Sequence, residues 1–189
     1  MPLILASTSA IRRQMLDNAG VDYAAEKPQV DEEELKLGLS DPAQIARQLA
    51  EAKALSIIGE WVIGSDSVVS VAGRLFSKPK DRDEAAAHLR FFSGKEMQLT
   101  SAVALAHGGA LDWGHAETAR LSVRPLSEAF IAEYLDAEWP EVGYTVGVFR
   151  LEGRGVQLFD RIDGDFFAIL GMPLLPLLGA LRERGQVVP

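Results

Sequence analysis

The sequence predicts an α/β protein with a mixed β-sheet. Predicted helices and strands alternate over the first part of the chain, whereas strands run together from Met97 onward. Alternation favours parallel pairing, and strands joined by short turns favour antiparallel pairing. The 189 residues contain no apparent internal repeat, and no linker divides them into separate domains. We therefore expect one domain over residues 1–189, with an elaboration into two lobes as the alternative.

The chain opens on a predicted strand, loop and helix. Residues 3–6 form an apolar run that is typical of a short buried strand. Ser7 or Ser9 then caps a helix that extends to about Ala19, and Gly20 ends it in the left-handed conformation. A second helix follows, with Asp41 as its cap and Pro42 in its first turn, and Gly59 as its stop.

The middle of the chain predicts a hairpin followed by a third helix. A strand begins at Trp61, breaks at Gly64-Ser65-Asp66, resumes to Val71 and turns back at Ala72-Gly73. Asp81 and Glu84 have the spacing of a capping box at the start of the helix that runs to Phe92. The later predicted elements are paired strands in MQLTSAVALAH and AETARLSVRP, a helix in SEAFIAEYLDA capped by Ser127, and a strand in VQLFDRI.

Composition excludes several classes of protein. The formal net charge of -8 argues against binding to a nucleic acid polymer or an anionic membrane, because both favour a basic face. The absence of cysteine excludes disulfides, thiolate catalysis and cysteine zinc sites. The N-terminus lacks a signal-peptide pattern, and the apolar stretch 166–181 is too short for a membrane span. We expect a soluble cytoplasmic protein.

Two arginines mark the start of the first predicted helix. Arg12 and Arg13 lie where unpaired N–H groups and the helix dipole favour an anion, and a guanidinium can grip a phosphate with two hydrogen bonds. The alternative is an ordinary helix start, because arginine is a good helix former.

Asp66 follows an apolar strand, in the place where open α/β sheets bind their ligands. Its carboxylate can hold a divalent metal or act as a general base, although Gly-Ser-Asp is also a common turn sequence. The four acids from Asp31 to Glu34 read as a solvated surface loop, with sharing of a metal with Asp66 as the alternative. Lys53 and Lys78 are candidate phosphate contacts, and no P-loop, GxGxxG or GxSxG motif is present.

Taken together and in order, these segments resemble the Maf family of nucleoside triphosphate pyrophosphatases. The matching segments cover nearly the whole chain: LASTSAIRRQML, VDE, LAEAKA, IGSDSVV, KPKDRDEAAAHLRFFSGK, TSAVAL, EGRGVQLFDRIDG and GMPL. The resemblance implies an elongated fold of the Maf/Ham1 (ITPase-like) type, in which a twisted mixed sheet with flanking helices carries a central cleft. It also implies a homodimer that uses a divalent cation (Mg, Mn or Co) to split a nucleoside triphosphate into monophosphate and pyrophosphate.

The resemblance also assigns roles to single residues. Asp66 matches the proton acceptor, and Glu32 matches a carboxylate that shares the metal with Asp66. The candidate substrate-binding residues are Ser7, Ser9, Arg12, Arg13, Lys53 and Lys78. The positions that match the family's specificity residues are Ile11, Ser67 and Glu152.

The specificity positions favour 7-methyl-GTP as the substrate. A carboxylate at Glu152 can accept hydrogen bonds from a guanine edge and favours the positive charge of a methylated ring. In the branch of the family that acts on pyrimidine nucleotides, these three positions look like arginine, threonine and glutamine. Hydrolysis of dTTP or UTP is therefore the alternative. Ala10 and Ala52 depart from the family's frequent proline and glutamate. A nucleotide-binding regulator of septum formation is the alternative from a different functional class.

Overall fold

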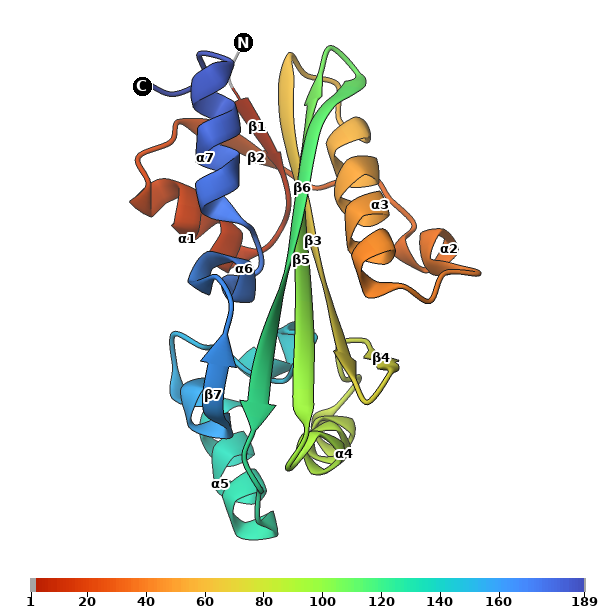
Figure 1. Ribbon diagram of the computed structural model, residues 1–189, viewed down its shortest axis with the longest axis vertical. Helices are drawn as coiled ribbons and strands as arrows, with labels where there is room; N and C mark the ends of the chain where they lie inside the picture. The colour runs from red at the N-terminus through yellow and green to blue at the C-terminus, as the bar shows by residue number, and fades with distance from the viewer. Residues whose placement is uncertain (1–2, 189) are drawn as a thin grey trace. The chain divides into compact units, whose positions relative to one another are not determined.

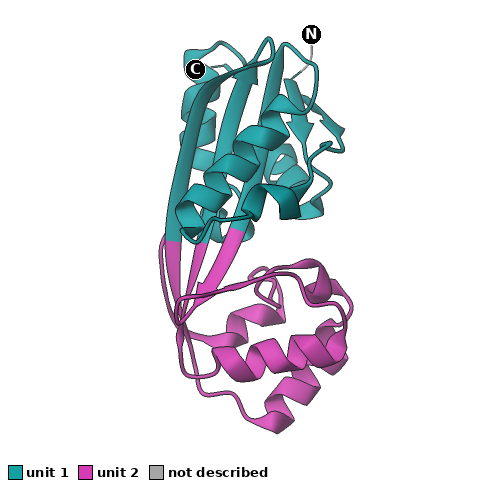
Figure 2. Ribbon diagram, turned by 90° about the vertical axis from the view of Figure 1, so that its right-hand side faces the viewer, with its two compact units in different colours: residues 1–67, 100–118, 165–189 teal, residues 68–99, 119–164 magenta. Residues whose placement is uncertain are grey.

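The computed structural model describes residues 3–188, which form two compact units. The first unit comprises residues 3–67, 100–118 and 165–188, and the second comprises residues 68–99 and 119–164 (Figure 2). Three strands, β3, β5 and β6, contribute residues to both units. None of the helices in the described part of the chain combines the length and apolar character that crossing a bilayer demands.

The order of the elements confirms the predicted α/β class with a mixed sheet. The strands are β1 (Leu3–Ala6), β2 (Tyr23–Glu26), β3 (Trp61–Val71), β4 (Arg74–Phe76), β5 (Glu96–His107), β6 (Ala110–Val123) and β7 (Phe159–Asp163). The α-helices are α1 (Ala10–Asn18), α2 (Glu32–Lys36), α3 (Pro42–Leu55), α4 (Arg82–Phe92), α5 (Glu128–Glu138), α6 (Phe166–Leu170) and α7 (Leu174–Glu183). The 3₁₀ helices are η1 (Glu141–Tyr144) and η2 (Arg154–Leu158).

The first unit is built around parallel strands. The sheet as a whole has the strand order β2-β1-β3-β5-β6-β7, with β4 paired to β3, and in the first unit β1 pairs in parallel with both β2 and β3. Helices α1 and α7 cover one face of the sheet and α3 covers the other (Figure 1). Leu5, Leu16, Ile63, Leu105 and Leu177 are among the buried residues of the core beneath α1 and α7. Since strand side chains alternate, even-numbered residues of β3 such as Gly64 face α3 instead.

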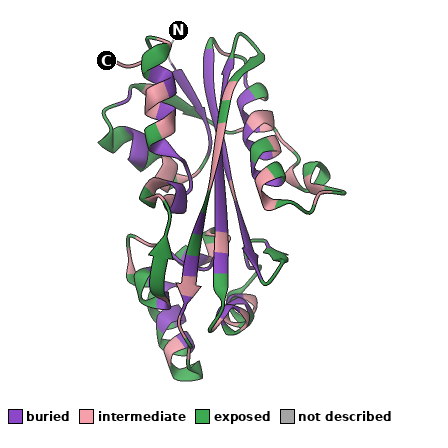
Figure 3. Ribbon diagram, in the orientation of Figure 1, coloured by how far each residue is buried: buried purple, intermediate pink, exposed green. Residues whose placement is uncertain are grey.

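The second unit begins at Val68, within β3. Strand β4 pairs antiparallel with the last residues of β3 after a turn in which Ala72 and Gly73 both have positive φ, as a tight hairpin requires. Phe76 packs edge-on against Phe92 of α4, with ring centroids 4.7 Å apart. Strand β7 pairs antiparallel with β6. Strands β3 and β5 are buried along most of their length (Figure 3).

Helix starts agree closely with the prediction. Ser9, Asp41, Asp81 and Ser127 are the N-cap residues of α1, α3, α4 and α5. The last three accept hydrogen bonds from backbone N–H groups of the first turn, whereas Ser9 makes no such bond. Satisfying these otherwise unpaired donors is the reason for the preference for short polar caps.

Four local predictions are wrong. Strand β3 continues through 64–66 without a break, because Gly64 provides space for α3 rather than a turn. Helix α3 ends at Leu55, before Gly59, because Ser56 caps it by donating its hydroxyl to the Lys53 carbonyl. The acidic run is not a loop. It forms α2, whose Asp31 cap accepts from two backbone N–H groups and whose acidic first turn suits the helix dipole. The strand predicted in VQLFDRI starts late, since its first residues belong to η2.

Candidate active site

Strand β1 ends before its parallel neighbour β3 does. Ala6 is the last residue of β1 and pairs with Gly64, after which the chain leaves at Ser7 toward α1. Residues 65–67 of β3 therefore extend beyond their parallel neighbour. This is the position at which open parallel sheets leave room for a ligand.

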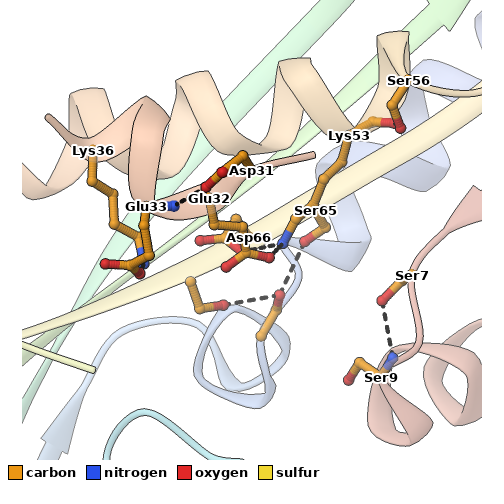
Figure 4. A network of polar contacts seen from close by, with 12 residues as sticks. Ser7, Ser9, Asp31, Glu32, Glu33, Lys36, Lys53, Ser56, Ser65 and Asp66 are labelled. Atoms are coloured by element: carbon orange, nitrogen blue, oxygen red, sulfur yellow. Dashed lines mark hydrogen bonds and ion pairs between the residues drawn. The ribbon is translucent and has the colours of Figure 1, made fainter. Parts of the chain in front are cut away.

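A charged cluster lies on the α3 side of β3. Lys53 extends from α3, and its Nζ lies 2.5 Å from Asp66 Oδ1 and 2.8 Å from Glu32 Oε1 of α2. Figure 4 shows the three side chains converging. Lys53 and Asp66 are both buried, at 6% and 8% exposure, and Glu32 is half-buried. Lys53 therefore bridges one carboxylate from β3 and one from α2 within a largely buried cluster.

Gly64 brings the helix to this position. A Cβ at Gly64 would lie 2.0 Å from the Ala50 carbonyl oxygen and 2.4 Å from the Ala54 nitrogen, both in α3. The absence of a side chain therefore lets α3 contact the strand directly. Lys53, one residue before Ala54, is thereby placed next to Asp66 on β3.

A second polar cluster lies on the opposite side of β3, where α1 and α6 meet the strand. Arg12 donates from Nε to the Gly171 carbonyl at 2.9 Å and from Nη2 to Ser67 Oγ at 3.1 Å. Ser65 donates to the same carbonyl at 3.1 Å and to the Ala102 carbonyl at 2.8 Å. Burial lowers the pKa of Arg12, and the charges of Asp66 and Glu32 partly offset this. The guanidinium stays protonated, because arginine is not deprotonated in proteins.

The loop between β1 and α1 completes this end of the unit. The buried Ser7 accepts a hydrogen bond from the Ser9 backbone N–H at 3.1 Å, so its hydroxyl organises the loop. Arg13 is exposed and donates to the Thr8 carbonyl. The two adjacent arginines therefore differ, since Arg12 points into the unit and Arg13 binds its own loop.

The remaining predicted residues are dispersed. Ile11 is half-buried in α1, beside Arg12. Lys78 and Glu152 belong to the second unit, where both are exposed. Their roles stay predictions.

Sequence reasoning missed several members of the cluster around Arg12, namely Ser65, Ser101 and the Gly171 carbonyl. Ser101 of β5 is fully buried, and its Oγ lies 2.8 Å from Ser67 Oγ. The Gly171 carbonyl, which follows α6, lies within hydrogen-bond distance of three donors: Arg12 Nε, Ser65 Oγ and Ser67 Oγ. A polar residue just before the apolar run AVALA was a signal for Ser101. No sequence signal marks a backbone carbonyl.

Asp66 and Glu32 are the two carboxylates of the cluster around Lys53 that could contribute oxygen ligands to a divalent cation. One oxygen of Asp66 and one oxygen of Glu32 both contact the Lys53 ammonium, so the two carboxylates lie close together. Carboxylate oxygens are the ligands that hard cations prefer. Within residues 3–188, no group of three or more acidic, histidine or cysteine side chains could hold a metal by itself. Magnesium commonly binds through one or two carboxylates and the phosphates of its substrate, which matches this pair.

The fold is an α/β fold in which two clusters of charged and polar side chains lie next to β3, near the carboxyl end of β1. A family model described as Maf-like protein matches residues 2–184. The chain belongs to the Maf family.

Individual proteins are similar over almost the full length. A 7-methyl-GTP pyrophosphatase of Rhizobium meliloti (strain 1021) is 45% identical, covering 98% of this chain and 97% of that protein. A nucleoside triphosphate pyrophosphatase of Ruegeria pomeroyi is 43% identical, covering 99% and 98%. A solved structure, the nucleoside-triphosphatase / dITP/XTP pyrophosphatase of Mycobacterium abscessus, has a TM-score of 0.43 at 16% identity, covering 67% of this chain and 76% of that one.

Proposed function

We propose that this protein is a nucleoside triphosphate pyrophosphatase that hydrolyses the bond between the α- and β-phosphates, giving a nucleoside monophosphate and pyrophosphate. The observation that supports this most directly is the buried Asp66 with Lys53 and Glu32 at the open end of β3. Membership of the Maf family and the names of its similar proteins support the same activity.

Asp66 is the proton acceptor in this proposal. Its carboxylate pairs with Lys53, and in this proposal it orients a water molecule and takes its proton as the oxygen attacks the α-phosphorus. Proton removal at the moment of attack contributes typically 10²- to 10⁴-fold to a hydrolytic rate. Arg12 binds the phosphate oxygens of the substrate and stabilises the charge on the departing pyrophosphate.

The charge balance of the site supports a divalent metal cofactor. Arg12 and Lys53 carry two positive charges, and Asp66 and Glu32 carry two negative charges, so these four side chains sum to zero. A bound triphosphate would leave its own negative charge uncompensated within this group. A divalent cation held by Asp66, Glu32 and the phosphates would offset that charge and polarise the phosphoryl oxygens.

7-Methyl-GTP is the substrate that this proposal favours over dTTP and UTP. Glu152 is exposed and ends in a carboxylate, which can accept hydrogen bonds from the guanine edge and attract the positive ring. The 7-methyl-GTP pyrophosphatase at 45% identity supports the same choice. The Asp66 cluster favours catalysis over a purely regulatory binding role, because binding alone does not need a proton acceptor.

The test is pyrophosphate release from 7-methyl-GTP, GTP, dTTP and UTP with and without added Mg²⁺ or Mn²⁺. We expect release that depends on the metal, with the highest kcat/KM for 7-methyl-GTP. Glu152→Gln should reduce that preference, whereas Glu133→Gln, at another exposed position of the second unit, should preserve it. Nucleotide binding without hydrolysis of any substrate would overturn the enzyme reading in favour of a regulator. A native preference for dTTP or UTP would overturn only the choice of base.

A further inference from the structure

Ser67 occupies a position that the family resemblance relates to base selection, but its hydroxyl is already committed within the first unit. Ser67 Oγ accepts from Arg12 Nη2 at 3.1 Å. It also lies 2.8 Å from Ser101 Oγ and 3.2 Å from the Gly171 carbonyl oxygen. A hydroxyl has one proton to donate, so each of these contacts constrains its direction.

Ser101 limits the roles that the Ser67 hydroxyl can take. The Ser101 hydroxyl donates its own proton to the Ala168 carbonyl at 2.7 Å, so it acts as an acceptor toward Ser67. Ser67 therefore donates inward, to Ser101 or to the Gly171 carbonyl, and turns a lone pair toward the arginine. Ser101 and Gly171 are both buried, so these two acceptors are shielded from water, whereas Ser67 itself is half-buried.

The Gly171 carbonyl holds the other side of the guanidinium. It accepts from Arg12 Nε at 2.9 Å. Gly171 has a φ of +117°, and a Cβ there would lie 3.4 Å from Ser67 Oγ and 3.6 Å from Arg12 Nε. The described hydrogen bonds of Arg12 thus use Nε and Nη2, while Nη1 takes no part in them.

We propose that Ser67, with the buried Ser101 behind it, is a positioning residue that fixes the Arg12 guanidinium for the substrate phosphates. Position 67 in this chain then determines affinity for the phosphate chain rather than the choice of base. The inference rests on the proposed function, since it takes the anion at Arg12 to be the phosphate chain of a nucleotide. A guanidinium held in place before binding loses less freedom when the phosphate arrives, which favours affinity.

The test uses inorganic tripolyphosphate, which has the phosphate chain but no base. Calorimetry in the presence of Mg²⁺ measures its Kd for the native protein and for Ser67→Val, Ser67→Thr and Ser101→Ala. Ser67→Val and Ser101→Ala should each raise this Kd by about fivefold to tenfold, the effect of one ordinary intramolecular hydrogen bond. Ser67→Thr keeps the hydroxyl and should stay within about twofold of the native protein.

Thr100→Val is the matched control for Ser101→Ala. Thr100 is the adjacent buried residue of β5, and its hydroxyl bonds Thr118 rather than any member of the Arg12 cluster. Thr100→Val, like Ser101→Ala, removes one buried hydroxyl, but it should leave the Kd for tripolyphosphate unchanged. In an Arg12→Lys background, Ser67→Val should add no further loss, because the effect runs through the guanidinium.

Nucleotide kinetics separate the two roles of position 67. Ser67→Val should raise KM for 7-methyl-GTP and dTTP by the same factor, leaving the ratio of their kcat/KM values unchanged. A changed ratio with unchanged tripolyphosphate affinity would overturn the proposal and make Ser67 a base-selecting residue. Equal losses in Ser67→Val and Ser67→Thr, or no tripolyphosphate binding by the native protein, would also overturn it. If tripolyphosphate binds as expected and no nucleotide is hydrolysed, the proposed function fails and the positioning role stands.

Discussion

The two faces of β3 carry polar clusters of different chemistry, although the residues involved are neighbours in the sequence. On the α3 side, Asp66 belongs to a cluster of full charges that are joined by one ammonium. On the α1 side, Ser65 and Ser67 belong to a cluster of neutral hydroxyls and one carbonyl around a single guanidinium. Breaking an ion pair in the first cluster leaves a buried charge, whereas losing a hydroxyl in the second leaves only a weaker constraint. The first cluster is suited to chemistry and the second to placement.

Asp66→Asn is expected to have the largest effect, because it removes the group that distinguishes the charged side. The amide keeps the shape but cannot accept the proton, so we expect pyrophosphate release to fall by about 10²- to 10⁴-fold while nucleotide binding persists. Glu33→Gln, which neutralises an exposed carboxylate of α2 that pairs with Lys36, serves as the control. Near-native turnover in Asp66→Asn would remove the aspartate from the mechanism.

Lys53→Met sharpens the comparison by leaving the two carboxylates without their shared cation. Breaking a buried ion pair costs about 3–5 kcal/mol, so the midpoint of urea unfolding should fall strongly. Lys36→Met breaks an exposed pair on α2 and should cost at most about 1 kcal/mol. Added Mg²⁺ should stabilise Lys53→Met more than the native protein. Equal unfolding midpoints for the two lysine variants would show that the Lys53 pair contributes no more than a surface pair.

Gly64→Ala tests the packing that brings the charged side together. The new methyl would contact the backbone of α3, and overpacking of this kind costs typically about 1–3 kcal/mol. Gly179→Ala in α7 is the matched control, since its Cβ would enter open space and alanine favours a helix by about 1 kcal/mol over glycine. Thermal unfolding of both variants gives the comparison. An unchanged Tm for Gly64→Ala would mean that α3 does not approach the strand this closely.

Ser65→Ala should give the smallest effect. Ser65 is fully buried and donates to the Ala102 and Gly171 carbonyls, but the latter retains other donors. We expect a loss of about 1 kcal/mol in the free energy of unfolding, measured in urea. Ser40→Ala, at an exposed position, should change it by less than about 0.5 kcal/mol. A loss in Ser65→Ala as large as that in Lys53→Met would erase the contrast between the two sides.

The sequence predicted local features better than contacts between distant segments. Capping residues such as Asp41 and Asp81 act within one turn, so their role is visible in a few letters. The α/β class followed from the same local patterns. The continuity of β3 was missed because Gly64 serves a helix that lies elsewhere in the sequence, while the same residue reads locally as a turn.

The candidate site divides in the same way. Asp66 and Lys53 were found because a strand end and a resemblance pointed to them, yet their direct pairing needed the packing of α3 on β3. Ser101 carries no catalytic signature and acquires its role only from contacts with Ser67 and Ala168. The Gly171 contribution is a backbone atom, which every residue type possesses, so composition and motif could not reveal it.

The hydrogen bond between Arg12 and Gly171 joins residues that are 159 positions apart, whereas Lys53 and Asp66 are 13 apart. During synthesis, the lysine and the aspartate emerge from the ribosome almost together. The Arg12 guanidinium gains its carbonyl acceptor only after a further 159 residues have been translated. A prematurely terminated product ending before residue 165 would therefore carry the carboxylates and the lysine but lack the acceptor that anchors the arginine. Translation of the segment that contains Gly171 thus controls when the Arg12 cluster can form.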